Sequence, residues 1–156
     1  MLDKQAFWHY AQQTYLHQDY SNKLLFLQDN YHLNINLLLL MAWLGQQKQG
    51  INHTHLTAIL QYARPWQEKI HRLRALRRQI KALNHLLYES VKSLELAGEK
   101  QMIMGLQSCC EGLNFIRSEQ PCVLDNLLVY VSSVQTADSI AQIHLRLDFL
   151  SKFSLK

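Results

Sequence analysis

The ten residues from Ile35 to Leu44 (INLLLLMAWL) are apolar except for Asn36. On a helix such a run is apolar around most of its circumference, so it must be buried on nearly all sides. Ten helical residues rise only about 15 Å, half the thickness of a bilayer core. Asn34, just before the run, is a favourable helix N-cap. The run therefore predicts a buried helix over about residues 35–45, at the centre of a helical bundle, and no membrane span.

The rest of the chain also favours helices. Its 156 residues include only two prolines and five glycines, so long regular elements are expected. Leu, Gln, Ala, Lys and Arg, all helix-favouring, are common. A hydrophobic fraction of 48% and this length fit one folded core. We therefore expect an all-α fold, a compact bundle of seven or eight helices without a sheet, and a single helical domain over residues 1–156.

Three segments of the sequence carry competing structural signals. Pro65 is expected to stop or kink the helix before it and to begin the next one. Asn84-His85 either breaks that next helix or lies inside a longer one. Residues 122–134 contain VLDNLLVYVSSV, whose β-branched residues suit a strand. No convincing partner strand is visible elsewhere, which favours a helix for this segment.

Positive charge is concentrated in one segment. From Arg64 to Lys81 the sequence reads RPWQEKIHRLRALRRQIK, with seven Lys/Arg and one acid, Glu68, a local charge of +6. The other 138 residues carry nine basic and eleven acidic side chains, a charge of −2. A nearly neutral body thus presents one basic helix, which indicates an anionic partner.

The basic helix has an apolar stripe, because Trp66, Ile70, Leu73, Leu76, Ile80 and Leu83 recur every three or four residues. At 100° per residue, Arg74, Arg78 and Lys81 form one edge of the polar face, and Arg72 lies on the other flank. These charges are either a solvated face or a site for an anionic group. Trp66 is either a core anchor or a stacking surface beside Arg64.

Arg77 falls inside the apolar arc of that helix. A buried guanidinium needs a carboxylate, carbonyls or an anion beside it. One interpretation is an internal ion pair with an acid such as Asp29, Asp125 or Glu95. The other is a bound anionic group in a cleft.

Signals for catalysis are lacking. The three cysteines, Cys109, Cys110 and Cys122, are odd in number and two are adjacent, which is typical of reduced thiols in a cytoplasmic protein. Eight histidines form no HExxH or repeated ExxH pattern, and no phosphate-binding or nucleophile-elbow motif occurs. We therefore expect no catalytic residue, metal or cofactor. Gly98, Gly105 and Gly112 lie seven residues apart; Gly98 and Gly105 indicate either close approach of another helix or a frayed or broken helix, and Gly112 is a possible C-cap.

These observations favour a non-catalytic cytoplasmic binding or adaptor module that engages an acidic protein partner through the basic helix, residues 64–81. An alternative is binding of RNA or a ribonucleoprotein, which would weaken steeply with salt. A third is a small anionic-ligand protein or enzyme with its site near Arg77. The pattern predicts no particular oligomeric state. The candidate partner-binding residues are Arg64, Trp66, Arg72, Arg74, Arg77, Arg78 and Lys81.

Several blocks also resemble an uncharacterised bacterial family, catalogued as domain of unknown function 2390. They are Phe7-Trp8-x-Tyr10-Ala11, Leu27-Gln28-Asp29, Asn34-x-Asn36-Leu37-Leu38-Leu39-Leu40, Trp43-Leu44, Arg64-Pro65-Trp66 and Leu73-Arg74-x-Leu76-Arg77-Arg78-x-x-Lys81. The resemblance covers about residues 5–83. It implies a small, helical, cytoplasmic bacterial protein and carries over no reaction, cofactor or catalytic residue. It does include the same Arg-Pro-Trp corner and basic helix.

Overall fold

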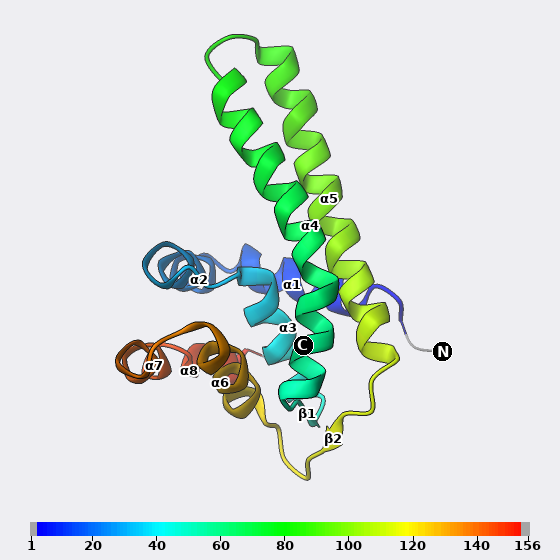
Figure 1. The fold of residues 1–156 in the computed structure, drawn as a ribbon, viewed down its shortest axis with the longest axis vertical. Coiled ribbons are helices and arrows are strands. Elements are labelled where there is room, and N and C mark those ends of the chain that lie inside the picture. The colour runs from blue at the N-terminus through cyan, green and yellow to red at the C-terminus, as the bar shows by residue number, and fades with distance from the viewer. Residues whose placement is uncertain (1–2, 154–156) are drawn as a thin grey trace. The chain divides into compact units, whose positions relative to one another are not determined.

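The computed structural model describes residues 3–153, which form eight α-helices and two very short strands (Figure 1). The all-α prediction is confirmed. In chain order the elements are α1 (Ala6–Leu16), α2 (Gln18–Tyr31), α3 (Ile35–Gln46), β1 (Gln49–Gly50), α4 (His53–Ile80), α5 (His85–Glu111), β2 (Ile116–Arg117), α6 (Val123–Val134), α7 (Ala137–His144) and α8 (Asp148–Lys152).

The expectation of no sheet is wrong in one detail. Strands β1 and β2 form an antiparallel pair in which Gln49 lies opposite Arg117 and Gly50 opposite Ile116. Two residues per strand are too few to show an alternating pattern, so the sequence gives no signal for this pair. Residues 122–134 supply helix α6 and no strand, as the sequence favoured.

The chain divides into two compact units. One contains the residues up to Leu56 together with those from Asn114 onward, and we call it the helical body. The other contains residues 57–113, and we call it the hairpin. The hairpin has nine Lys/Arg and five Glu, a charge of +4, whereas the body has seven of each sign and is neutral. The single-domain expectation stays a prediction, because two compact units can still unfold in one cooperative transition.

Helix α3 forms the core of the helical body, as predicted for residues 35–45. Its leucines from Leu37 to Leu40 are each at most 1% exposed. Fully burying one leucine side chain stabilises a fold by about 1.5–3 kcal/mol. The side chain of Asn34 accepts a hydrogen bond from the Leu37 N–H at 3.1 Å, which confirms the predicted N-cap.

Helix α6 packs against α3 with direct backbone contact. A Cβ added at Gly45 would stand 2.5 Å from the Cα of Val123, so only glycine fits there. The side chain of Asn126 is buried and donates hydrogen bonds to the carbonyls of Met41 and Gln49, at 3.3 and 2.8 Å. These contacts fix α6 against both α3 and the strand that follows it.

The hairpin contains α4 from residue 57 onward and all of α5, two antiparallel helices that form the long green pair in Figure 1. The expected helix boundary at Pro65 is wrong, because α4 continues through it from His53 to Ile80. A proline inside a helix removes one backbone hydrogen bond and its ring crowds the carbonyl of Gln61, but the turns on either side keep their hydrogen bonds. Lys81 then lies just beyond the helix. The helical conformation is interrupted before α5. The side chain of Asn84 caps α5 by accepting a hydrogen bond from the Leu87 N–H at 3.1 Å.

One of the three spaced glycines, Gly105, has a clear packing role. A Cβ at Gly105 would overlap the hydroxyl oxygen of Tyr62 on the facing helix, which explains a glycine in the middle of α5. At Gly98 the nearest atom to such a Cβ is Ile70 Cγ1 at 3.6 Å, an ordinary contact. Gly112 occupies the C-cap of α5, as predicted.

Candidate functional site

A buried carboxylate lies at the centre of the hairpin. The side chain of Glu95 on α5 is 7% exposed and receives hydrogen bonds from two arginines of α4. Arg77 Nε lies 2.5 Å from its Oε2, and Arg74 Nε lies 2.9 Å from its Oε1. Arg74 also donates from Nη2 to Glu99 Oε1 at 2.9 Å. Of the two interpretations of Arg77, the structure bears out the internal ion pair, with Glu95 as its partner.

Burial, hydrogen bonds and neighbouring charges together shift the pKa values of the ionisable side chains in this cluster. Burial acts to raise the pKa of Glu95, but the hydrogen bonds and charges of Arg74 and Arg77 outweigh it, so the pKa lies below its ordinary value. For Glu99 burial dominates over the single arginine, and the pKa is raised. The hydrogen bond to Glu95 raises the pKa of Arg77, and the Tyr88 hydroxyl adds to this. Glu95 is therefore the anion that holds the two guanidinium groups at neutral pH.

The other predicted cations are exposed and take no part in the ion pairs of this cluster. The side chains of Arg64, Arg72, Arg78 and Lys81 are exposed, and within residues 3–153 none makes an ion pair. On α4, Arg64, Arg72 and Arg78 lie about 100–140° around the helix from Arg77, which faces α5. We call these four residues the outer basic face.

Trp66 matches neither of its predicted roles, core anchor or exposed stacking surface, completely. Its side chain is half-buried, and Lys69 Nζ lies 5.3 Å from the centroid of its rings. A cation at that distance from an aromatic face is attracted by the ring quadrupole. Trp66 thus lies at the surface of α4 beside Lys69, with part of its side chain covered.

Three further residues that shape this site are not among those predicted from the sequence. They are Glu99, which binds Arg74; Tyr88, whose hydroxyl accepts from Arg77 Nη1 at 3.4 Å; and Tyr62, which fills the space above Gly105. One signal was present. Glu95 and Glu99 are four residues apart on the helix after the basic one, and such a pair presents both carboxylates on one face.

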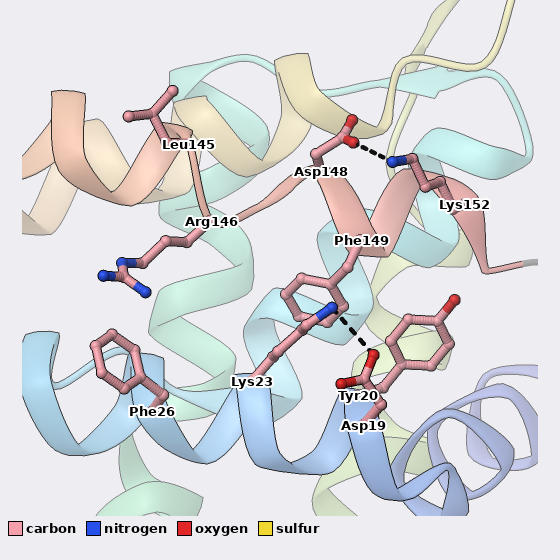
Figure 2. A pocket seen from close by; sticks show the side chains of 9 residues that line it. All are labelled: Asp19, Tyr20, Lys23, Phe26, Leu145, Arg146, Asp148, Phe149 and Lys152. Atoms are coloured by element: carbon pink, nitrogen blue, oxygen red, sulfur yellow. Dashed lines mark ion pairs between the residues drawn. The ribbon is translucent and has the colours of Figure 1, made fainter.

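A second candidate is a groove on the helical body, between α2 and the segment from Leu145 to Lys152 (Figure 2). Its volume is about 550 Å³. Figure 2 shows aromatic rings and charged groups together along this groove. It is lined by Asp19, Tyr20, Lys23, Phe26, Leu145, Arg146, Asp148, Phe149 and Lys152.

Most charges in this groove are already paired. Lys23 binds Asp19 at 3.0 Å and Lys152 binds Asp148 at 2.7 Å, each within one helix. The hydrogen bond from Lys152 lowers the pKa of Asp148. Arg146 lies over the ring of Phe26, with 4.4 Å between the guanidinium carbon and the ring centroid. The groove can hold a flat or anionic group beside Arg146, but it shows no nucleophile or acid–base pair poised for catalysis.

Other site types find little support in the part of the chain that the structure describes. Within residues 3–153, no group of three or more His, Cys, Asp or Glu side chains could hold a metal ion. The three cysteines in that range are free, and burial raises the pKa of Cys110 to about 12, so its thiol stays protonated. None of the helices in that range has the length and apolarity to cross a bilayer.

Fold and site together define an all-α protein with a strongly basic helical hairpin. The chain belongs to the family described as protein of unknown function (DUF2390), whose sequence profile matches residues 6–106. The match extends past the resemblance over residues 5–83, and it includes Glu95 and Glu99 as well as the basic segment. No curated protein and no solved structure matches the chain significantly.

Proposed function

We propose that this protein is a non-catalytic binding module of the cytoplasm, and that its hairpin engages an acidic surface on a partner protein. The observation that carries the proposal is the charge distribution. The whole net charge of +4 belongs to the hairpin, and its outer basic face is exposed. A localised positive surface raises the rate of encounter with acidic partners and disfavours basic ones.

The cations of α4 divide into two roles. Arg74 and Arg77 are engaged by Glu95, so we assign them to holding α5 against α4. The outer basic face, with Trp66 beside it, is left for the partner. Exposed ion pairs contribute only about 0.2–1 kcal/mol each, so this face supplies orientation and speed of association more than affinity.

The two alternatives are less well supported by the geometry. Single-stranded nucleic acid is bound by cations interleaved with exposed aromatic rings. Trp66 is the one aromatic residue of the basic segment, and it is half-buried. A small anionic ligand at Arg77 would have to displace Glu95, which accepts from Arg77 Nε at 2.5 Å, and the Tyr88 hydroxyl. Binding an acidic protein surface through the outer basic face requires neither an exposed aromatic ring nor the guanidinium group of Arg77.

The test is capture of partners by the tagged full-length protein, with mass spectrometry and with or without nuclease. The variant Arg72→Glu with Arg78→Glu should lose the partner that the wild type captures, and nuclease should not affect capture. A matched control is Lys4→Glu with Arg117→Glu, which makes the same charge change at exposed sites on the helical body. Capture that survives reversal at Arg72 and Arg78, or that disappears with nuclease, would contradict the proposal.

A further inference from the structure

The hairpin exposes large apolar side chains as well as charges. Leu76 is 45% exposed, Leu83 81%, Leu87 54% and Leu94 58%. Scattered exposed leucines are ordinary on a protein surface, whereas a contiguous apolar patch marks an interaction site. The position of these residues around the two helices decides between the two cases.

The Tyr62–Gly105 contact marks one edge of the interface between α4 and α5. Ile80 follows Tyr62 by eighteen residues and Leu87 precedes Gly105 by eighteen, about five helical turns in each case, so both lie at this same edge. Arg74 and Glu99, which pair with each other, are each about 120° around their helices from that edge.

Four of the six exposed leucines of the hairpin share one side, whereas Leu86 and Leu96, 78% and 55% exposed, lie about 100° and 180° around α5 from Gly105. Leu76 lies about 40° around α4 from Tyr62, and Leu94 about 20° around α5 from Gly105. The Arg74–Glu99 pair is on the opposite edge. We call this surface the leucine face, and its members are Leu73, Leu76, Ile80, Leu83, Leu87 and Leu94.

The spacing of the leucine face suits a helix as its partner. Along α4 and its C-terminal turn the members are separated by three, four and three residues, and Leu87 and Leu94 are one heptad apart. Apolar side chains at these intervals on two antiparallel helices form a seam into which a third helix packs. Recognition of an amphipathic helix in such a groove uses anchors at i, i+3, i+4 and i+7.

The charges at the border of the leucine face are positive. Lys69 and Arg72 lie about 20° and 40° around α4 from Leu76, whereas the nearest acid of that helix, Glu68, is about 80° away. On α5, Glu95 and Glu99 are engaged by arginines, and Glu89 lies about 160° from Leu87. A helix on this face would therefore meet cations along its flank.

We infer that the leucine face binds an acidic amphipathic helix of the partner protein. This inference rests on the proposed function, and it names the part of the partner that is recognised. A second copy of this chain would bring Lys69 and Arg72 against the same cations, which is unfavourable. Lipid-binding segments that recognise anionic membranes use clusters of about four to eight cations, more than the two that border this face.

The probe is a displayed library of twenty-residue helical peptides. Leucines are fixed at three- and four-residue spacing, and the flanking positions are randomised among Glu, Gln and Lys. Selection on the full-length protein should enrich Glu. The variant Leu76→Ser with Leu94→Ser should bind the enriched peptides about tenfold more weakly or worse, because two apolar anchors are lost. The matched control is Leu16→Ser with Leu145→Ser, two body leucines that are 82% and 85% exposed. Circular dichroism should show all variants folded.

The outcomes separate this inference from the proposed function. Enrichment of Gln or Lys, or of nothing, overturns the inference. If Glu-rich peptides bind the Leu76→Ser/Leu94→Ser variant as tightly as the wild type but fail on Arg72→Glu/Arg78→Glu, the inference fails and the proposed function stands. Self-association in sedimentation equilibrium, or binding to phosphatidylserine vesicles, that the leucine substitutions abolish would assign the face to another occupant and also overturn it.

Discussion

The Nε atom of Arg77 lies 2.5 Å from Oε2 of Glu95, a carboxylate whose side chain is only 7% exposed. Arg74 binds the other oxygen of the same group. The hairpin thus uses two of its seven clustered cations to hold its own helices together. Its remaining cations are left on the outside, where a partner can reach them.

We expect Glu95→Gln to lower the free energy of unfolding by about 3 kcal/mol, the low end of the range for breaking a buried ion pair, because both arginines are partly exposed. Urea unfolding at neutral pH measures this. Glu89→Gln is the matched control, an exposed glutamate on the same helix that should change the value by less than about 0.5 kcal/mol. Equal effects of the two substitutions would refute the structural role of Glu95.

Stability should depend on pH through the same cluster. The pKa of Glu95 is lowered in the folded state, so its contribution is complete above the ordinary value of 4.5 and is lost as pH falls through the folded pKa. The pKa of Glu99 is raised, so its contribution has the opposite sign and favours folding as pH falls. Urea unfolding between about pH 3 and 7 should show a shallower acid slope for Glu95→Gln and a steeper one for Glu99→Gln. Identical slopes in wild type and both variants would contradict this account.

Gly105 and Tyr62 should be energetically coupled. Gly105→Ala alone should destabilise by about 1–3 kcal/mol, because the new Cβ forces the Tyr62 ring to move. In a Tyr62→Ala background the same change should stabilise by up to about 1 kcal/mol, the helix-propensity gain of alanine over glycine. A double-mutant cycle by urea unfolding measures the difference. Additive effects would show that the two residues do not meet.

Gly45→Ala and Gly98→Ala should act in opposite directions. A Cβ at position 45 meets the backbone of Val123 at 2.5 Å, and backbone cannot swing aside, so a loss of about 3 kcal/mol or more is expected. A Cβ at position 98 meets Ile70 Cγ1 at 3.6 Å, so the helix-propensity gain of up to about 1 kcal/mol should remain. Thermal and urea unfolding compare the two. A stable Gly45→Ala protein would contradict the contact between α3 and α6.

Local sequence pattern predicted the elements whose determinants are local. The apolar run after Asn34 could only be a buried helix, and its cap is present. Pro65 lies inside α4, although a proline favours a helix boundary, because the helical turns on both sides are retained and outweigh its local cost. Local rules describe the preference of a position, and tertiary packing overrides it.

The site was only partly predictable, for a different reason. The apolar arc identified Arg77 as a residue that needs a partner, but periodicity on one helix does not say which of several acids faces it. The apolar stripe also does not say which of its members are covered by other parts of the protein, and Leu76 and Leu83 are 45% and 81% exposed. The groove in the helical body unites Phe26 and Arg146, which are 120 residues apart in the sequence. No short-range sequence pattern predicts a contact between residues so far apart in the chain.

The central claim is that the outer basic face binds an acidic protein. The most direct measurement is a titration of the captured partner, once purified, against the wild type, Arg72→Glu/Arg78→Glu and Lys4→Glu/Arg117→Glu by calorimetry. We predict affinity at least about tenfold weaker for the reversal at Arg72 and Arg78, and affinity equal to wild type for the control. Equal affinity for all three proteins would contradict the account.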